Sequence, residues 1–157
     1  MAGPISDCGT ADRAKLAERL AEILKNMDAW CARLEDFADR LPADVEASEC
    51  LSIARDLSAD IQSAHEFEEG ELFATLRGDA EIVKRLGPAL ERLHSEHLED
   101  ESFTQEIREC LADFAMDKKR CNVDSLAYML RGFFESKRRH CAFEREFLLP
   151  LLKPGQA

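Results

Sequence analysis

Apolar residues recur along this chain with the alternating steps of three and four residues that are typical of helices in a bundle. The first such segment covers about residues 11–41, and its apolar stripe consists of Leu16, Leu20, Ile23, Met27, Trp30, Leu34, Phe37 and Leu41. Three further segments show the same periodicity, at about residues 44–77, 89–117 and 123–149. Each segment is long enough to form a helix of many turns.

Residues that disfavour helices separate these segments. They are the Gly and Pro before residue 10, Leu41-Pro42, the stretch 78–88 and the polar stretch 117–122. Short connections between long helices favour antiparallel neighbours. We therefore predict an all-α fold, an antiparallel up-down four-helix bundle. It would form one domain over residues 1–157, with a core at about 11–152 and short flexible termini.

The apolar stripes of the last three segments are interrupted by histidine and glutamate residues four positions apart. The pairs are His65/Glu69, His97/Glu101 and His140/Glu144. Residues four apart lie on one helix face, and the three histidines fall within about one turn of each other when counted from the connections. A buried carboxylate costs several kcal/mol unless it is paired or bound to a metal. The pattern therefore predicts a metal site.

Two neighbouring residues are further candidates for this site. Glu68 lies in the acidic run HEFEEGE and competes with Glu69 as the ligand from the second segment. His94 lies one turn before His97, close enough to lean into the site, although an exposed or outer position is the simpler interpretation.

Lys137 occupies a stripe position one turn before His140. We expect its amine to reach solvent along the edge of the bundle, as long basic side chains commonly do. The alternative is that it stays near the site and tunes its charge.

The ligand types indicate which metal would bind. Imidazole and carboxylate ligands without a thiolate suit iron or manganese, and zinc less specifically. Six ligands exceed the needs of one tetrahedral zinc, and carboxylates from facing helices can bridge two ions. We predict a cofactor of two non-haem iron ions, with manganese or zinc as alternatives.

Composition narrows the set of partners. The formal net charge is -11, with 32 acidic residues spread along the chain. Such a balance repels phosphate backbones and anionic lipids, so we expect neither a nucleic-acid nor a membrane partner. The first residues show no secretion signal, so we expect a cytoplasmic protein whose six cysteines are reduced.

The residues around the three pairs resemble the hemerythrin-like, or HHE cation-binding, domain. The resemblance lies in HEFEEGELF, LHSEHL and HCAFEREFLLPLL, and it spans about residues 15–152. It implies a bundle around a bridged di-iron centre that binds oxygen or reacts with oxygen, peroxide or nitric oxide. His65, His97 and His140 would be terminal ligands, Glu69 and Glu144 bridges, and Glu101 a terminal or bridging ligand.

The sequence departs from this family at the first helix, which normally supplies a histidine. Here Ile23 and Met27 occupy the corresponding stripe positions. Occupancy by a single metal is therefore as compatible with the sequence as occupancy by two. We expect a protein that senses or handles iron, oxygen, peroxide or nitric oxide, with a regulatory protein partner. The alternatives are a di-iron peroxidase or oxidase, and an interaction bundle with a degenerate site.

Overall fold

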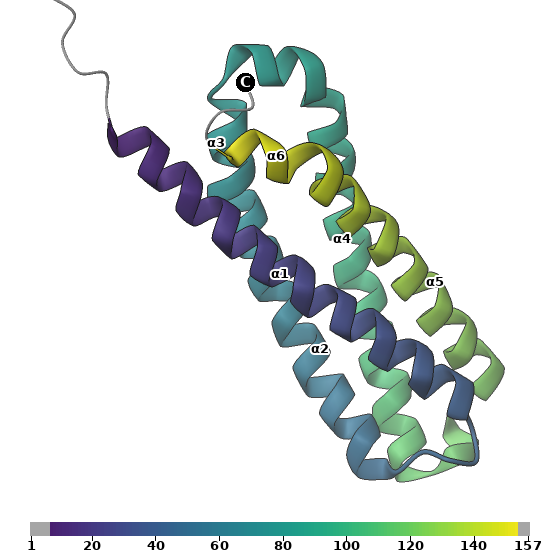
Figure 1. The fold of residues 1–157 in the computed structure, drawn as a ribbon. Helices are drawn as coiled ribbons and strands as arrows, with labels where there is room; N and C mark the ends of the chain where they lie inside the picture. The colour runs from purple at the N-terminus through teal and green to yellow at the C-terminus, as the bar shows by residue number, and fades with distance from the viewer. Residues whose placement is uncertain (1–6, 154–157) are drawn as a thin grey trace, which may run out of the picture.

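A computed structural model describes residues 7–153, so the predicted flexible termini lie largely outside the described residues. Four long helices form an antiparallel bundle (Figure 1): α1 (Asp7–Arg40), α2 (Ala47–Phe67), α4 (Ala80–Met116) and α5 (Val123–Phe143). Short elements complete the chain: η1 (Glu68–Phe73), α3 (Ala74–Arg77), η2 (Lys118–Arg120), η3 (Glu144–Leu148) and α6 (Leu149–Leu152). The predicted fold class is confirmed. No helix between residues 7 and 153 combines the length and apolar character of a membrane span.

The predicted apolar stripes form the core. In α1 the side chains of Leu20, Leu34 and Phe37 are fully buried. The long helices pack in pairs, α1 against α5 and α2 against α4, while α4 also contacts α5. This arrangement brings α2, α4 and α5 around one interior region.

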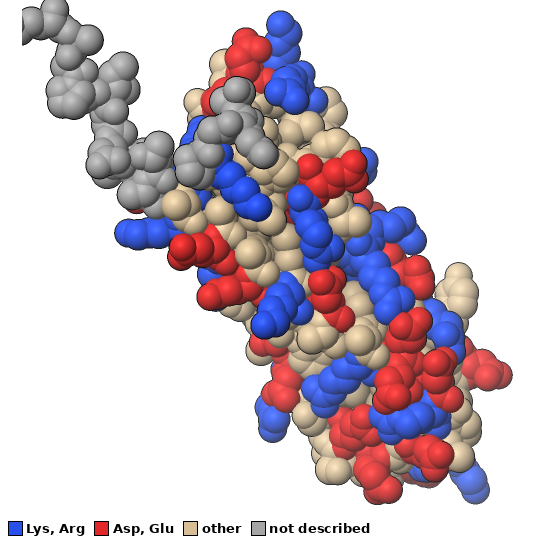
Figure 2. Space-filling view, in the orientation of Figure 1, with Lys and Arg blue, Asp and Glu red and all other residues tan. Residues whose placement is uncertain are grey.

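Charged side chains align α1 with α5 and η3 on the outside of the bundle. Arg131 pairs with Asp39 at 2.6 Å, and Arg145 pairs with Asp28 at 2.7 Å. Figure 2 shows Lys and Arg side chains interspersed with Asp and Glu over this face. Exposed pairs of this kind contribute at most about 1 kcal/mol each, so burial of the stripes dominates the stability.

Helix α4 begins earlier than predicted. The stretch 78–88 was expected to separate two helices, but α4 starts at Ala80, and Pro88 lies inside it. The carboxylate of Asp79 caps the start by accepting hydrogen bonds from the backbone N–H groups of Glu81 and Ile82. In Figure 1 the first part of α4 crosses the end of the bundle before the helix turns down into it. The predicted break is therefore confined to Gly78 and Asp79, and the prediction is wrong for residues 80–88, which belong to α4.

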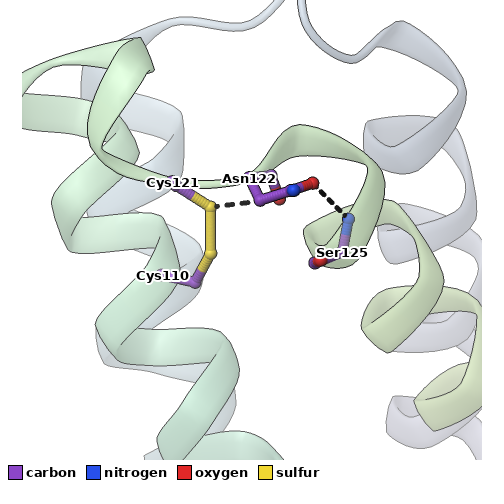
Figure 3. Close-up of a disulfide and its surroundings, with 4 residues drawn as sticks. All are labelled: Cys110, Cys121, Asn122 and Ser125. Atoms are coloured by element: carbon purple, nitrogen blue, oxygen red, sulfur yellow. Dashed lines mark hydrogen bonds between the residues drawn. A yellow bond between two sulfur atoms is a disulfide. The ribbon is translucent and has the colours of Figure 1, made fainter.

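A disulfide, Cys110–Cys121, joins the last turns of α4 to the turn before α5 (Figure 3). The 3-10 turn η2 reverses the chain, which brings the two Cα atoms to 5.6 Å from each other. The Asn122 side chain then caps α5 by accepting a hydrogen bond from the Ser125 backbone N–H, at 3.0 Å. The prediction of reduced cysteines is wrong for this pair, while Cys31, Cys50 and Cys141 are free and buried.

Two helices widen into π turns where their interior residues become acidic. Glu68 opens η1, and Glu144 opens η3. A π turn accommodates one extra residue, so the buried face shifts by one position beyond it. The regular steps of the fourth stripe, from Lys137 through His140 and Glu144, predict a buried position for Phe147. In η3 the shift instead exposes 43% of Phe147 and buries Leu148 completely. The predicted position of Phe147 is therefore wrong.

Candidate metal centre

Seven polar or charged side chains are buried where α2, α4 and α5 meet. They are His65, Glu68, His97, Asp100, Lys137, His140 and Glu144. They follow one another along α2 with η1, along α4 and along α5 with η3 at spacings of three or four residues, which places them on the same face in consecutive turns. Because neighbouring helices run antiparallel, the residues sort into two layers. We call Glu68, His97, His140 and Glu144 the glutamate layer, and His65, Asp100 and Lys137 the lysine layer.

In the glutamate layer, ligand atoms from three helix segments converge. Glu68 Oε2 lies 2.6 Å from His97 Nε2 and 3.5 Å from His140 Nε2. One ligand atom from each of these residues lies within 4.8 Å of the other two. Glu144 Oε1 lies 3.7 Å from His140 Nε2. The first three residues can thus offer two nitrogens and one carboxylate to one point, with the Glu144 carboxylate beside His140. Such a mixture of donors suits iron and manganese.

The two imidazoles of this layer are oriented from outside by carboxylates. His97 Nδ1–H donates to Glu69 Oε1 at 2.7 Å, and His140 Nδ1–H donates to Glu96 Oε2 at 2.8 Å. His94 Nδ1 also donates to Glu69, at 2.9 Å. With the ring proton on Nδ1, each Nε2 directs a lone pair inward. Histidines that bind metals are commonly held in this way.

Several buried atoms of the cluster lack a hydrogen-bond partner. They are Nε2 of His97 and of His140, Oε2 of Glu68, both carboxylate oxygens of Glu144, both ring nitrogens of His65 and Oδ2 of Asp100, although this last oxygen is ion-paired with Lys137. At 2.6 Å, Nε2 of His97 and Oε2 of Glu68 would face each other with lone pairs unless a proton or a cation lay between them. Buried polar atoms rarely remain unpaired in native proteins, so these residues fit a metal ion.

Burial and close charges shift the pKa values of the glutamate layer in opposite directions. Burial opposes ionisation of Glu68, but hydrogen bonds from His140 and His97 outweigh it and lower the pKa of its carboxyl well below the usual range. Burial and the charge of Glu68 raise the pKa of Glu144. Burial alone would lower the pKa of His140, but Glu144, Glu68 and Glu96 raise it well above its usual value. A metal ion would have to displace the His140 proton.

The lysine layer already contains a cation. Lys137 Nζ pairs with Asp100 Oδ2, and both side chains are buried. His65 Nε2 lies 3.6 Å from the same oxygen, and the His65 ring stacks on His97 with the ring centroids 4.1 Å apart. The expectation that Lys137 reaches solvent is wrong, because only 3% of this residue is exposed. Its pairing with Asp100 compensates for the burial.

Charges in the lysine layer are fixed by this pair. Burial would lower the pKa of Lys137, but Asp100 and Glu68 raise it, so the amine stays protonated. Burial would raise the pKa of Asp100, but His65 and Lys137 lower it. Burial lowers the pKa of His65, which favours the neutral imidazole.

The structure brings most of the sequence-predicted residues together, but not all. His65, His97, His140 and Glu144 lie in the cluster, and so does the second candidate, Glu68. Glu69 lies outside it, 29% exposed, between His94 and His97. The side chain of Glu101 is 58% exposed, with Oε1 3.6 Å from His65 Nδ1.

Asp100 takes the inward position that was expected for Glu101. A signal for it existed in the sequence, because strict alternation of four and three steps along Leu93, His97, Asp100 and Thr104 predicts that position. Helix α1 contributes only apolar side chains, including the buried Ile23 and Met27. Among the described residues, the cluster therefore draws its polar groups from three of the four long helices.

A groove of about 520 Å³ opens between α2 and α4 beside this cluster. Its lining residues are Ser58, Ile61, Gln62, His65, Glu66, Glu69, Glu101 and Thr104. His65 belongs both to this lining and to the lysine layer, so the groove reaches the edge of the cluster.

Comparison with protein families gives one match. A model of the hemerythrin HHE cation binding domain matches residues 18–152. That span includes every residue of both layers. No curated protein and no solved structure matches the chain.

Proposed function

Because the chain belongs to the hemerythrin HHE cation-binding domain family, we propose that it binds iron in the glutamate layer and uses the bound iron to sense or handle oxygen, peroxide or nitric oxide. The family match covers most of the chain and concerns cation binding. The choice of iron and of these small ligands is the proposal.

The observation that carries the proposal is the pair of inward nitrogens on His97 and His140. Each ring is held by a carboxylate on Nδ1, and each Nε2 lacks a hydrogen-bond partner. Glu68 and Glu144 supply oxygens on the opposite side of the same space. We propose these four residues as the ligands, with Glu69 and Glu96 as the carboxylates that orient the imidazoles.

The chemistry of the donors favours iron. Cys141 is adjacent in sequence to His140, but burial raises the pKa of its thiol, so no thiolate competes with the imidazoles. Nitrogen and oxygen donors without sulfur suit iron and manganese better than zinc. Bound iron would supply a redox-active Lewis acid at this point. The second ion implied by the family resemblance would need His65 and Asp100 as ligands. The Asp100 carboxylate is already paired with the Lys137 ammonium group.

The groove between α2 and α4 supports a small-molecule ligand. Its lining includes His65, which is 4% exposed and belongs to the lysine layer, so a small molecule such as oxygen or peroxide in the groove would lie beside the cluster. The same access favours the second candidate function, a peroxidase or oxidase. Turnover of peroxide by the iron-loaded protein would distinguish the two.

A sensor function would follow from the way the ligands tie helices together. Glu68, His97 and His140 come from η1, α4 and α5, so a metal ion would clamp these three segments. A change at the metal would alter that clamp and could be read by a protein partner. A cytoplasmic location remains part of the proposal.

Metal loading tests the proposal directly. The purified protein is incubated with ferrous iron under argon, desalted and analysed for bound metal, and its melting temperature is compared with that of the metal-free form. We expect bound iron and a higher melting temperature. His140→Ala should lose both, while His94→Ala, which removes a histidine from the edge of the site, should retain both. Absence of bound iron in the wild type would favour the interaction bundle instead.

A further inference from the structure

We propose that the Lys137 ammonium group takes the place of a second metal ion, so that this chain binds one iron where its family resemblance implies two. The inference rests on the proposed function, because it concerns the number of ions in the same cluster. It follows from where the amine lies, what it pairs with and which ligands remain.

The amine lies inside the cluster. Lys137 stands one turn from His140 on α5, and only 4% of its side chain is exposed. Nζ pairs with Asp100, and its positive charge also acts on Glu68 and Glu144. A cation therefore already lies among the carboxylates that a second metal would need.

The balance of charge in the cluster is consistent with a single metal. Three carboxylates are buried there, from Glu68, Asp100 and Glu144, together with one ammonium group. One divalent ion would neutralise the remaining negative charge when the imidazoles are neutral. A second divalent ion would leave excess positive charge in a region shielded from water, where such charge is costly.

The ligands left for a second ion are too few. The lysine layer offers His65 and Asp100, and Asp100 is already neutralised by Lys137. Helix α1 places Ile23 and Met27 in its buried face, and Glu101 is mostly exposed. Sites for two metals hold their ions only about 3.5–4 Å apart and need bridging groups between them. Removal of the lysine charge would free Asp100 to become such a group.

The number of bound ions tests the inference. Wild type, Lys137→Met and the double variant Lys137→Met/Asp100→Asn are loaded with excess ferrous iron under argon, desalted and analysed for iron per chain. We expect one iron in the wild type, two in Lys137→Met and one in the double variant, which lacks both the charge and the freed carboxylate. Methionine has a similar length without the charge, and circular dichroism checks the fold. If Lys137→Met does not fold, Lys137→Gln replaces it.

A spectroscopic measurement accompanies the count. After oxidation, the wild type should give the electron paramagnetic resonance signal of an isolated ferric ion. Lys137→Met should lose much of it as the two ions couple, and should gain near-ultraviolet absorption. Two irons in the wild type would overturn this inference and leave the proposed function standing, whereas no iron would overturn the proposed function. One iron in both the wild type and Lys137→Met would overturn the role of Lys137.

Discussion

The two layers of the cluster are built alike but differ in charge. The lysine layer draws on α2, α4 and α5, and the glutamate layer, one turn away, draws on η1, α4, α5 and η3. Both layers contain buried atoms without a hydrogen-bond partner, and in the glutamate layer these include atoms of all four residues. In the lysine layer, an ammonium group of the chain itself pairs with the carboxylate. Under the function that we propose, this difference means that a single lysine side chain takes the place of a metal ion in one of the two layers.

The largest effect on stability is expected when the buried Lys137 ammonium group loses the carboxylate of Asp100. Asp100→Leu should leave Lys137 charged and buried, and should lower the free energy of unfolding of the metal-free protein by about 3–5 kcal/mol. Urea denaturation measures this loss. Asp100→Leu/Lys137→Met should recover most of it. Glu101→Gln, at the neighbouring exposed position, should change the free energy of unfolding by less than about 0.5 kcal/mol.

The next largest effect is the stabilisation by bound iron. Iron at about a hundred times its dissociation constant should stabilise the wild type by about 2.7 kcal/mol. Glu68→Gln should abolish this gain, because Glu68 contacts both inward imidazoles. Thermal denaturation with and without ferrous iron measures it. If iron stabilised Glu68→Gln as much as the wild type but did not stabilise Glu69→Gln, the roles given to these two glutamates would be reversed.

A smaller effect is expected at the outer carboxylates. Glu96→Gln keeps a hydrogen-bond acceptor for His140 Nδ1 but removes its charge, so iron affinity should fall about tenfold to a hundredfold. Competition with a coloured chelator measures the affinity. Glu99→Gln, at an exposed position of the same helix, is the matched control and should bind iron like the wild type. Equal affinities in the two variants would contradict an orienting role for Glu96.

The layers should also differ in how their histidines titrate in the metal-free protein. The pKa of His140 is raised, so its contribution to stability is present at low pH and is lost as the pH rises through the folded-state value. The pKa of His65 is lowered, so its contribution is present at high pH and is lost as the pH falls through the folded-state value. At the pH where an ordinary imidazole is half protonated, nuclear magnetic resonance should find His140 mostly protonated and His65 mostly neutral. The opposite order would contradict the electrostatic difference between the layers.

Sequence periodicity was sufficient to predict the bundle and the convergence of His65, His97 and His140. Both depend on counting residues along regular helices, and the helices are regular up to the site. The same counting placed Phe147 in the core, because nothing in the pattern shows that a helix widens into a π turn. It also treated Gly87 and Pro88 as a break, although tertiary packing and the Asp79 cap extend α4 through them.

The role of Lys137 was harder to predict. A lysine in an apolar stripe most often extends to solvent, and only the tertiary structure shows Asp100 opposite it on another helix. The Cys110–Cys121 bond is a similar case, since a spacing of 11 residues matches no common cysteine motif and the contact depends on how the chain turns at η2. Long-range pairings of this kind require the fold.

The π turns have a consequence for how this chain can tolerate changes in length. On α5 the buried face before η3 follows Lys137 and His140, whereas beyond η3 it follows Leu148 and Leu152. Each side of the turn thus has a helical register of its own. A residue inserted or deleted in the last turns would rotate only the apolar face beyond the site and leave the cluster in place. Such a change would therefore reduce the burial of Leu152 while the polar centre keeps its register.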